Sequence, residues 1–288
     1  MTVPLEIGVA VVDANRLKVL AARKSIDADT LSSLLGEDSA AELMPAGSRV
    51  SHLYFGSEFC EQLFPEENAL QRAIEVARQL DLTFVLATPI ANDALVERIG
   101  HATAALLDDA EVLVNDWGVA NYLRNAFPRR RLIGGRQLAK MIKDPRAPSG
   151  QWLNAYGGSY GTAGHRRVLD HLGIDCIELD APPFATPTLF AVAGVRVSVW
   201  APYGYVAKGR ICKVGSLHRS GPDKFAPGRA CHRECRSLVE SGSAAARSGV
   251  VPTMRGNVIY YRHDRAITQV LREAIAAGHV SRLVLCGV

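Results

Sequence analysis

Residues 83–116 read TFVLATPIANDALVERIGHATAALLDDAEVLVND and contain a strand, a helix and a second strand in that order. The apolar run Thr83–Ala87 predicts a strand, which the Thr-Pro pair after it would end. Asn92 can cap the helix that comes next, and the run Glu111–Val114 predicts the second strand. This pattern is typical of a βαβ unit in a parallel sheet.

The same alternation of strand and helix extends along the chain on both sides of this stretch. About seven or eight such units favour a closed barrel over an open sheet. We therefore expect an α/β fold, a TIM-barrel-like (β/α) barrel that forms a single domain over residues 1–288 and carries a cysteine-bearing loop segment. The other expected strands are 5–12, 51–55, 131–133, 176–179, 195–200, 258–261 and 282–285, and the other expected helices are 16–24, 65–80, 118–127, 137–143, 165–172 and 265–277.

Composition and charge narrow the class of protein. Of the 288 residues, 48% are hydrophobic and 22% are charged, which is an ordinary globular composition. No apolar run of about 18 residues is present, so we expect no membrane span. The N-terminus lacks the features of a signal peptide, so we expect a cytoplasmic protein with reduced thiols. The net charge of +4 allows an anionic small molecule or weak RNA contact and identifies neither.

Polar residues follow several predicted strands, at the end where a barrel places its chemistry. Asn115 and Arg136 hold such positions and are candidates for substrate binding, and Asp116 is a candidate for proton transfer. Glu178 lies inside a predicted strand and is a candidate for a buried catalytic carboxylate. Each could equally be an ordinary cap or loop residue, and the sequence leaves both interpretations open.

A cysteine-bearing segment, residues 204–236, is the least conventional part of the chain. It reads GYVAKGRICKVGSLHRSGPDKFAPGRACHRECR and contains Cys212, Cys231 and Cys235 among glycines and cations. Little apolar periodicity is present, so the segment cannot bury enough apolar surface to order itself cheaply. Thiolates gathered on a metal would hold it, but three soft ligands are one short of a tetrahedral zinc site or an iron–sulfur cubane.

The fourth ligand has to come from elsewhere in the chain. Cys60 follows a predicted strand in a tight turn and is favoured, since Cys176 and Cys286 lie in apolar runs and are expected to be inert core residues. A histidine could instead complete a Cys₃His zinc site. Only one short cysteine pair is present, which is untypical of a zinc ribbon and compatible with a cluster held between loops. The histidines that could serve are His218 and His232.

Four stretches resemble one known family. They are SHLYFGSEFCEQL (51–63), EVLVNDWGVANYL (111–123), VSVWAPYGYVAKGRIC (197–212) and ACHRECR (230–236). Together they resemble the peptidase U-thirty-two family, and within it the branch that acts in oxygen-independent ubiquinone biosynthesis. The order of four cysteines is the specific part of the likeness. The interval of 18 residues between Cys212 and Cys231 looks longer than in that branch.

The resemblance implies a barrel-like fold in which Cys60, Cys212, Cys231 and Cys235 ligate a 4Fe-4S cluster. It also implies hydroxylation of an aromatic ring of a quinone precursor without molecular oxygen, with prephenate as the source of the hydroxyl group. The chain would work as one subunit of a heterodimer with a related protein. Proteolysis is not expected, because the chain contains no nucleophile elbow and no His-Glu-x-x-His motif.

Other functions remain open. Relatives in the family hydroxylate bases of tRNA or rRNA, and the basic run Arg129–Arg131 could meet phosphates. The chain could also be a non-catalytic scaffold that bears a cluster, or an α/β protein stabilised by zinc. Metal content and salt-dependent retention of RNA would separate these alternatives.

Overall fold

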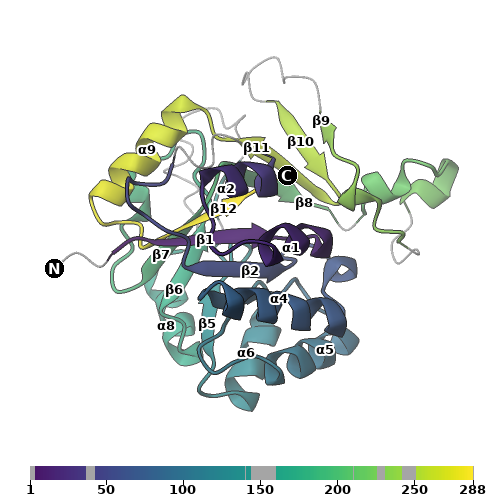
Figure 1. Cartoon of the computed structure of the whole chain (residues 1–288), viewed down its shortest axis with the longest axis horizontal. Helices are drawn as coiled ribbons and strands as arrows, with labels where there is room; N and C mark the ends of the chain where they lie inside the picture. The colour runs from purple at the N-terminus through teal and green to yellow at the C-terminus, as the bar shows by residue number, and fades with distance from the viewer. Residues whose placement is uncertain are drawn as a thin grey trace.

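The computed structural model describes residues 4–36, 43–139, 141–143, 160–209, 211–225, 231–241 and 251–287. Eight parallel strands close into a barrel in the order β1-β12-β7-β6-β5-β4-β3-β2, because β1 pairs with both β2 and β12. The predicted α/β barrel is confirmed (Figure 1). Its strands are β1 (Glu6–Val11), β2 (His52–Gly56), β3 (Thr83–Ala87), β4 (Glu111–Val114), β5 (Arg131–Gly134), β6 (Cys176–Leu179), β7 (Arg196–Ala201) and β12 (Arg282–Cys286).

Helices cover the outside of the barrel, and side-chain caps fix where several of them begin (Figure 1). The Asn92 side chain accepts a hydrogen bond from the Leu95 N–H at 2.9 Å, as the sequence predicts. Among the described residues, no helix is long and apolar enough to cross a membrane. The helices are α1 (Ala14–Ala21), α2 (Ala28–Leu35), α4 (Glu67–Gln79), α5 (Asp93–Ala104), α6 (Trp117–Ala126), α8 (Ala163–Leu172) and α9 (Arg265–Ala276).

Successive residues of each barrel strand point to opposite sides of the wall. In β4, Val112 and Val114 pack in the apolar layer under the helices, whereas Leu113 packs in the barrel interior. The interior is filled by side chains and is not an open channel. It contains Tyr54, Val85, Leu113, Ile133, Cys176, Trp200, Val284 and Cys286.

A buried ion-pair network closes the amino-terminal end of the barrel. The Arg282 guanidinium contacts Glu111 at 2.7 Å and Glu6 at 2.7 Å, and it donates to the Tyr54 hydroxyl at 2.9 Å. Burial, with Arg282 nearby, lowers the pKa of His52 to about 4, so this imidazole is neutral at pH 7. Because this end is filled, ligands have to approach from the carboxyl ends of the strands.

A second, antiparallel sheet continues from the carboxyl end of β7, in the order β8-β11-β10-β9 (Figure 1). The predicted strand 258–261 is present as β11, but it pairs in this sheet and not in the barrel. The cysteine-bearing segment connects β8 to β9. The elements of this region are β8 (Tyr203–Lys208), η3 (Val214–Ser216), η4 (Gly221–Phe225), η5 (Glu234–Arg236), β9 (Glu240–Ser241), β10 (Pro252–Arg255) and β11 (Val258–Arg262).

Candidate metal centre

Cys60 lies just past the carboxyl end of β2, where the chain turns sharply. Gly56 ends the strand with φ of 126°, a backbone conformation that residues other than glycine rarely adopt. The Cys60 N–H then donates to the Ser57 hydroxyl at 3.1 Å, and the Leu63 N–H donates to the Cys60 carbonyl at 3.1 Å. Local hydrogen bonds therefore hold the backbone that carries the half-buried thiol, as expected for a turn at the barrel mouth.

Cys212 lies beyond β8, just before the short helix η3. The Gly215 N–H donates to its sulfur at 3.2 Å, and the Ser216 hydroxyl donates to its carbonyl. A Cβ atom on Gly215 would lie 3.3 Å from the same sulfur, so glycine keeps this approach open. The thiol is held by the first turn after the strand.

Cys231 lies three residues before η5 and Cys235 lies within it. The helix η5 contacts η3. The Arg233 N–H donates to the Cys231 sulfur at 3.3 Å, and Arg233 itself has φ of 60°. The Arg233 guanidinium contacts Glu66, the residue before α4, at 2.9 Å. This ion pair ties the cysteine-bearing segment back to the barrel.

The four cysteines lie within electrostatic reach of one another. Burial raises the pKa of Cys235 to about 11, and the other three thiols Cys212, Cys60 and Cys231 also contribute. Burial likewise raises the pKa of Cys60, with smaller contributions from Cys231 and Cys212. Segments that are distant in sequence thus place thiols near enough for their charges to influence one another. All six cysteines of the chain are free.

The four thiols do not form a ready-made site for a single metal ion. In the part of the chain that the structure describes, no three Cys, His, Asp or Glu side chains form a group that could hold a metal ion as arranged. The sulfur atoms of Cys212 and Cys231 nevertheless accept backbone N–H bonds, which favour thiolates and tune a cluster. Close to Cys212, the buried Oε2 of Glu234 has no hydrogen-bond partner. Four thiols would suffice for a cubane.

The other candidate ligands differ in their surroundings. Cys176 and Cys286 sit in the barrel wall, where burial raises the pKa of each to about 12, as expected of core cysteines. The His218 ring lies 3.9 Å from a Glu234 oxygen, and its side chain is 53% exposed. His232 is exposed beside Cys231.

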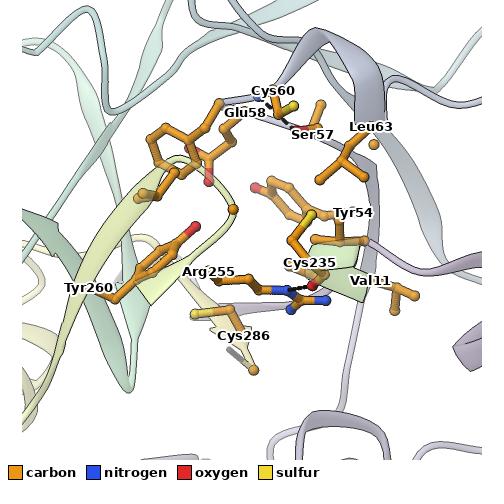
Figure 2. Close-up of a pocket in the computed structure, with 18 of the residues that line it drawn as sticks. Val11, Tyr54, Ser57, Glu58, Cys60, Leu63, Cys235, Arg255, Tyr260 and Cys286 are labelled. Carbon is orange, nitrogen blue, oxygen red and sulfur yellow. Dashed lines mark hydrogen bonds between the residues drawn. The ribbon is translucent and has the colours of Figure 1, made fainter. Parts of the chain in front are cut away.

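A pocket lies between the thiols and the barrel interior. Figure 2 shows Cys60 and Cys235 on its wall, with Tyr54, Tyr260 and Cys286 facing the same space. Its cavity volume is about 70 Å³. Aromatic side chains form much of the lining, which suits a flat apolar ring.

Arg136 is on the wall of this pocket, but its donors are already used. The guanidinium contacts Glu58 at 2.5 Å and Asp180 at 2.8 Å, and it lies over the Trp200 ring at 4.2 Å. Lys143 contacts the second oxygen of Asp180 at 2.5 Å. Burial alone would raise the pKa of Asp180, yet Lys143 and Arg136 outweigh burial and lower it. Arg136 therefore shapes the pocket, and its predicted contact with substrate stays a prediction.

The turns around Arg136 depart from the sequence prediction. Residues 136–139 form turns where we expected the start of a helix over 137–143. The Lys143 ammonium and the Arg136 guanidinium converge on one carboxylate, that of Asp180. Arg136 and Lys143, which follow β5, thus both reach the carboxyl end of β6, where Asp180 lies.

Glu178 lies inside the barrel, as the sequence predicts. Its Oε2 accepts a hydrogen bond from the Trp200 indole N–H at 2.5 Å, and its Oε1 has no hydrogen-bond partner. Burial, and next the Glu58 charge, raises the pKa of Glu178 to about 8. The side chain therefore carries a proton at pH 7. It lies directly behind Trp200, which lines the pocket.

Asn115 and Asp116 make contacts that stabilise the fold. The buried Asn115 amide donates to the Thr88 carbonyl at 3.0 Å and accepts from the Gln137 N–H at 3.2 Å. Asp116 caps α6 by accepting from the Gly118 N–H at 2.7 Å. Neither lines the pocket, so their predicted catalytic and binding roles remain untested predictions.

Several residues of the site escaped the sequence analysis. Glu58 and Asp180 each follow a barrel strand, the signal that selected Asn115 and Arg136, and could have been found by the same rule. Others carry no local signal, because they reach the site from the second sheet or from inside the strands. These are Tyr54, Lys143, Trp200, Arg255, Asn257 and Tyr260.

No family model matches the chain, and no curated protein is significantly similar to it. Among solved structures, it is similar to the C-terminal domain of a putative chitinase from Desulfitobacterium hafniense, at 9% identity over 98% of this chain and 93% of that one, with a TM-score of 0.43. A putative alpha-L-fucosidase from Bacteroides thetaiotaomicron is 7% identical over 99% of this chain and 88% of its own, with a TM-score of 0.46. Similarity this low bears on neither ligand nor activity.

A third structure is of the same kind. The glycoside hydrolase family 18 N-acetylglucosaminidase from Paenibacillus barengoltzii is 12% identical over 99% of this chain and 95% of its own, with a TM-score of 0.42. The barrel of the present chain is established by its own strand pairing. Function has to be argued from the site.

Proposed function

We propose that the chain is a 4Fe-4S protein that takes part in the oxygen-independent hydroxylation of an aromatic ring in ubiquinone biosynthesis, as one subunit of a complex with a related protein. The observation that supports the proposal is the mutual electrostatic influence of four free thiols from three distant segments, two of which, Cys60 and Cys235, line the pocket. The resemblance to the peptidase U-thirty-two family supports the same four ligands. A cytoplasmic location suits the proposal, because thiols stay reduced there.

Cys60, Cys212, Cys231 and Cys235 would hold the cluster. When bound, such a cluster supplies single-electron transfer, at a potential set by hydrogen bonds to sulfur and by nearby charge. Lys208 lies within the electrostatic influence of Cys60 and provides one such charge. The chain's own contribution is to bring the thiols together and to shield them partly from water.

The pocket residues would bind and orient the ring. Tyr54 and Trp200 form an edge-to-face pair with centroids 5.7 Å apart, and Tyr260 lies on the same pocket. Glu178 holds a proton behind Trp200 and, by accepting from the indole N–H, fixes the ring that lines the pocket. Replacing a ring C–H by C–OH is a two-electron oxidation, so without dioxygen it needs an oxygen donor, for which the resemblance implies prephenate, and also an external electron acceptor such as an oxidised quinone, to which a cluster would pass the two electrons one at a time.

The alternative of RNA-base hydroxylation loses part of its support. Arg130 donates to the carbonyls of Leu106 and Ala110, and Arg131 contacts Glu111 at 3.0 Å. Two of the three arginines in the basic run therefore have structural partners. A cluster-bearing scaffold without activity of its own stays compatible with the same thiol arrangement.

The test is an anaerobic incubation of the protein and its copurified partner with a quinone precursor, prephenate and an oxidised quinone as electron acceptor, followed by mass spectrometry of the ring product. The proposal expects a product 16 mass units heavier, corresponding to one added oxygen atom, and none when the partner or prephenate is left out. Hydroxylation of RNA bases in place of the quinone precursor would contradict the proposed substrate. A matched reaction with Cys60→Ala protein controls for contaminating activity.

A further inference from the structure

The turn between β10 and β11 contacts the segments of both Cys60 and Cys212. The Asn257 side chain donates to the Phe59 carbonyl at 3.2 Å and to the Gly209 carbonyl at 3.0 Å. Its own backbone carbonyl accepts the Gly209 N–H at 2.7 Å. Phe59 directly precedes Cys60, and Gly209 lies three residues before Cys212. One amide group thus spans two of the segments.

The same turn also holds the third segment. The Arg255 Nε donates to the Cys235 carbonyl at 3.1 Å, a contact that Figure 2 marks beside the pocket. Gly256 has φ of 62°, and a Cβ atom there would lie 3.5 Å from the Cys235 sulfur. The turn therefore passes the Cys235 thiol at van der Waals distance. It contacts the chain next to Cys60, the chain just before Cys212, and Cys235 itself.

We propose that the turn Arg255-Gly256-Asn257 positions the metal centre, with Asn257 as the residue that sets the separation of Cys60 from Cys212. The inference rests on the proposed function, because it takes the four thiols as the ligands. Cys60 is fixed to the barrel by its own turn. Cys212 lies on a segment with little apolar anchoring, so a bridge from outside that segment is needed to hold it in register.

Asparagine suits this bridge for a chemical reason. Its amide nitrogen carries two hydrogens and can donate to two carbonyls at once. Aspartate has no donor and would place a negative charge against both carbonyl oxygens. Glutamine keeps the two donors but adds one methylene, which shifts them outward. Comparing asparagine, aspartate and glutamine at position 257 therefore distinguishes the effect of the two hydrogen-bond donors from the effect of side-chain length.

The test measures the thiol set without relying on activity. Reduced, iron-free protein is titrated with Co²⁺, whose bands with thiolate ligands report binding. Partners outside the ligand set typically change metal affinity by about 10- to 100-fold, so we expect Asn257→Ala to weaken Co²⁺ binding by at least about tenfold. Asn257→Gln should recover part of the loss. Asn125→Ala, on an exposed position of α6, is the matched control and should bind Co²⁺ like the wild type.

A purely structural role makes a different prediction. It would lower the midpoint of thermal unfolding of Asn257→Ala and leave the Co²⁺ affinity of the folded protein unchanged, and that result would overturn the inference. If Asn257→Ala fails to fold, Asn257→Gln decides alone, by whether its Co²⁺ affinity falls. Wild-type affinity in that variant would overturn the inference.

The outcome also separates this inference from the proposed function. Iron and sulfide in anaerobic wild-type protein, with unchanged Co²⁺ affinity in Asn257→Ala, would refute the positioning role alone. A wild type without iron–sulfur that binds Co²⁺, and loses it in the variant, would support the positioning role and contradict the cluster. A wild type that binds no Co²⁺ would overturn both.

Discussion

At the scale of single residues, the candidate centre depends on backbone N–H groups that point at sulfur. Gly215 and Arg233 each donate to a cysteine sulfur, at 3.2 and 3.3 Å. Such bonds stabilise a thiolate more than a thiol, and so oppose the burial that keeps the free thiols protonated. Metal binding then has to release protons, so metal affinity should fall at low pH.

Removing one thiol should deplete the metal. Cys60→Ala takes away the one proposed ligand that lies outside residues 204–236, so we expect iron retention at least about tenfold weaker than in the wild type. Iron and sulfide per chain, measured after anaerobic purification, check this. Cys176→Ala is the control, since it removes a cysteine of the barrel interior and should keep the iron. Equal iron in both variants would exclude Cys60 as a ligand.

Glu178 should make stability depend on pH. Its pKa is about 8 in the folded protein and near the ordinary glutamate value of 4.5 when unfolded, so the native state keeps a proton that the unfolded state loses. Stability contributed by the protonated acid is full below about pH 4.5 and is lost as the pH rises towards 8. Glu178→Gln removes this loss and should be more stable than the wild type at pH 8 by a few kcal/mol, on the order expected for a buried acid. Urea unfolding at pH 5 and pH 8 measures it, and equal pH slopes in the two proteins would contradict it.

At the scale of elements, the strand ends decide where side chains meet. The repeated βαβ pattern predicted the barrel, and the caps at Asn92 and Asp116 mark real helix starts. The second sheet was not predicted, because β8 follows β7 with only Pro202 between them and looks like a continuation of one strand. Its partner β11 lies about 50 residues further on, and pairing over that distance leaves no local signal.

Gly56 at the end of β2 should tolerate no side chain. A Cβ atom there would lie 2.3 Å from the Ala87 carbonyl oxygen, and its φ of 126° is itself unfavourable for other residues. We expect Gly56→Ala to lower the free energy of unfolding by roughly 2–4 kcal/mol. Gly164→Ala is the control in α8, where a Cβ atom meets nothing within 4 Å. Thermal unfolding compares them, and equal midpoints would refute the strain at Gly56.

At the scale of the whole molecule, charge clusters organise the two ends of the barrel. Arg282 gathers Glu6 and Glu111 at the amino-terminal end, and Arg136 gathers Glu58 and Asp180 at the other. Sequence could suggest strand-end residues but could not pair them, because Arg282 and Glu111 are 171 residues apart. The single-domain organisation and the heterodimer stay predictions.

The amino-terminal network should behave as a buried ion pair. Arg282→Met leaves the Glu111 carboxylate buried without its main cation, which should cost about 3–5 kcal/mol of unfolding free energy. The double variant Arg282→Met, Glu111→Gln removes both charges and should recover part of that loss. Urea unfolding of the single and double variants gives the coupling. If the double variant loses as much unfolding free energy as Arg282→Met and Glu111→Gln lose together when measured separately, the two residues are not coupled.

The central claim is that this barrel holds an iron–sulfur cluster on four cysteines, and metal analysis of the anaerobically purified wild-type protein tests it most directly. Iron, acid-labile sulfide and zinc would be measured together with the ultraviolet–visible spectrum. The account predicts about four irons and four sulfides per chain, with a broad thiolate–iron absorption band. One zinc per chain, without sulfide or colour, would contradict it and leave a zinc-stabilised barrel in its place.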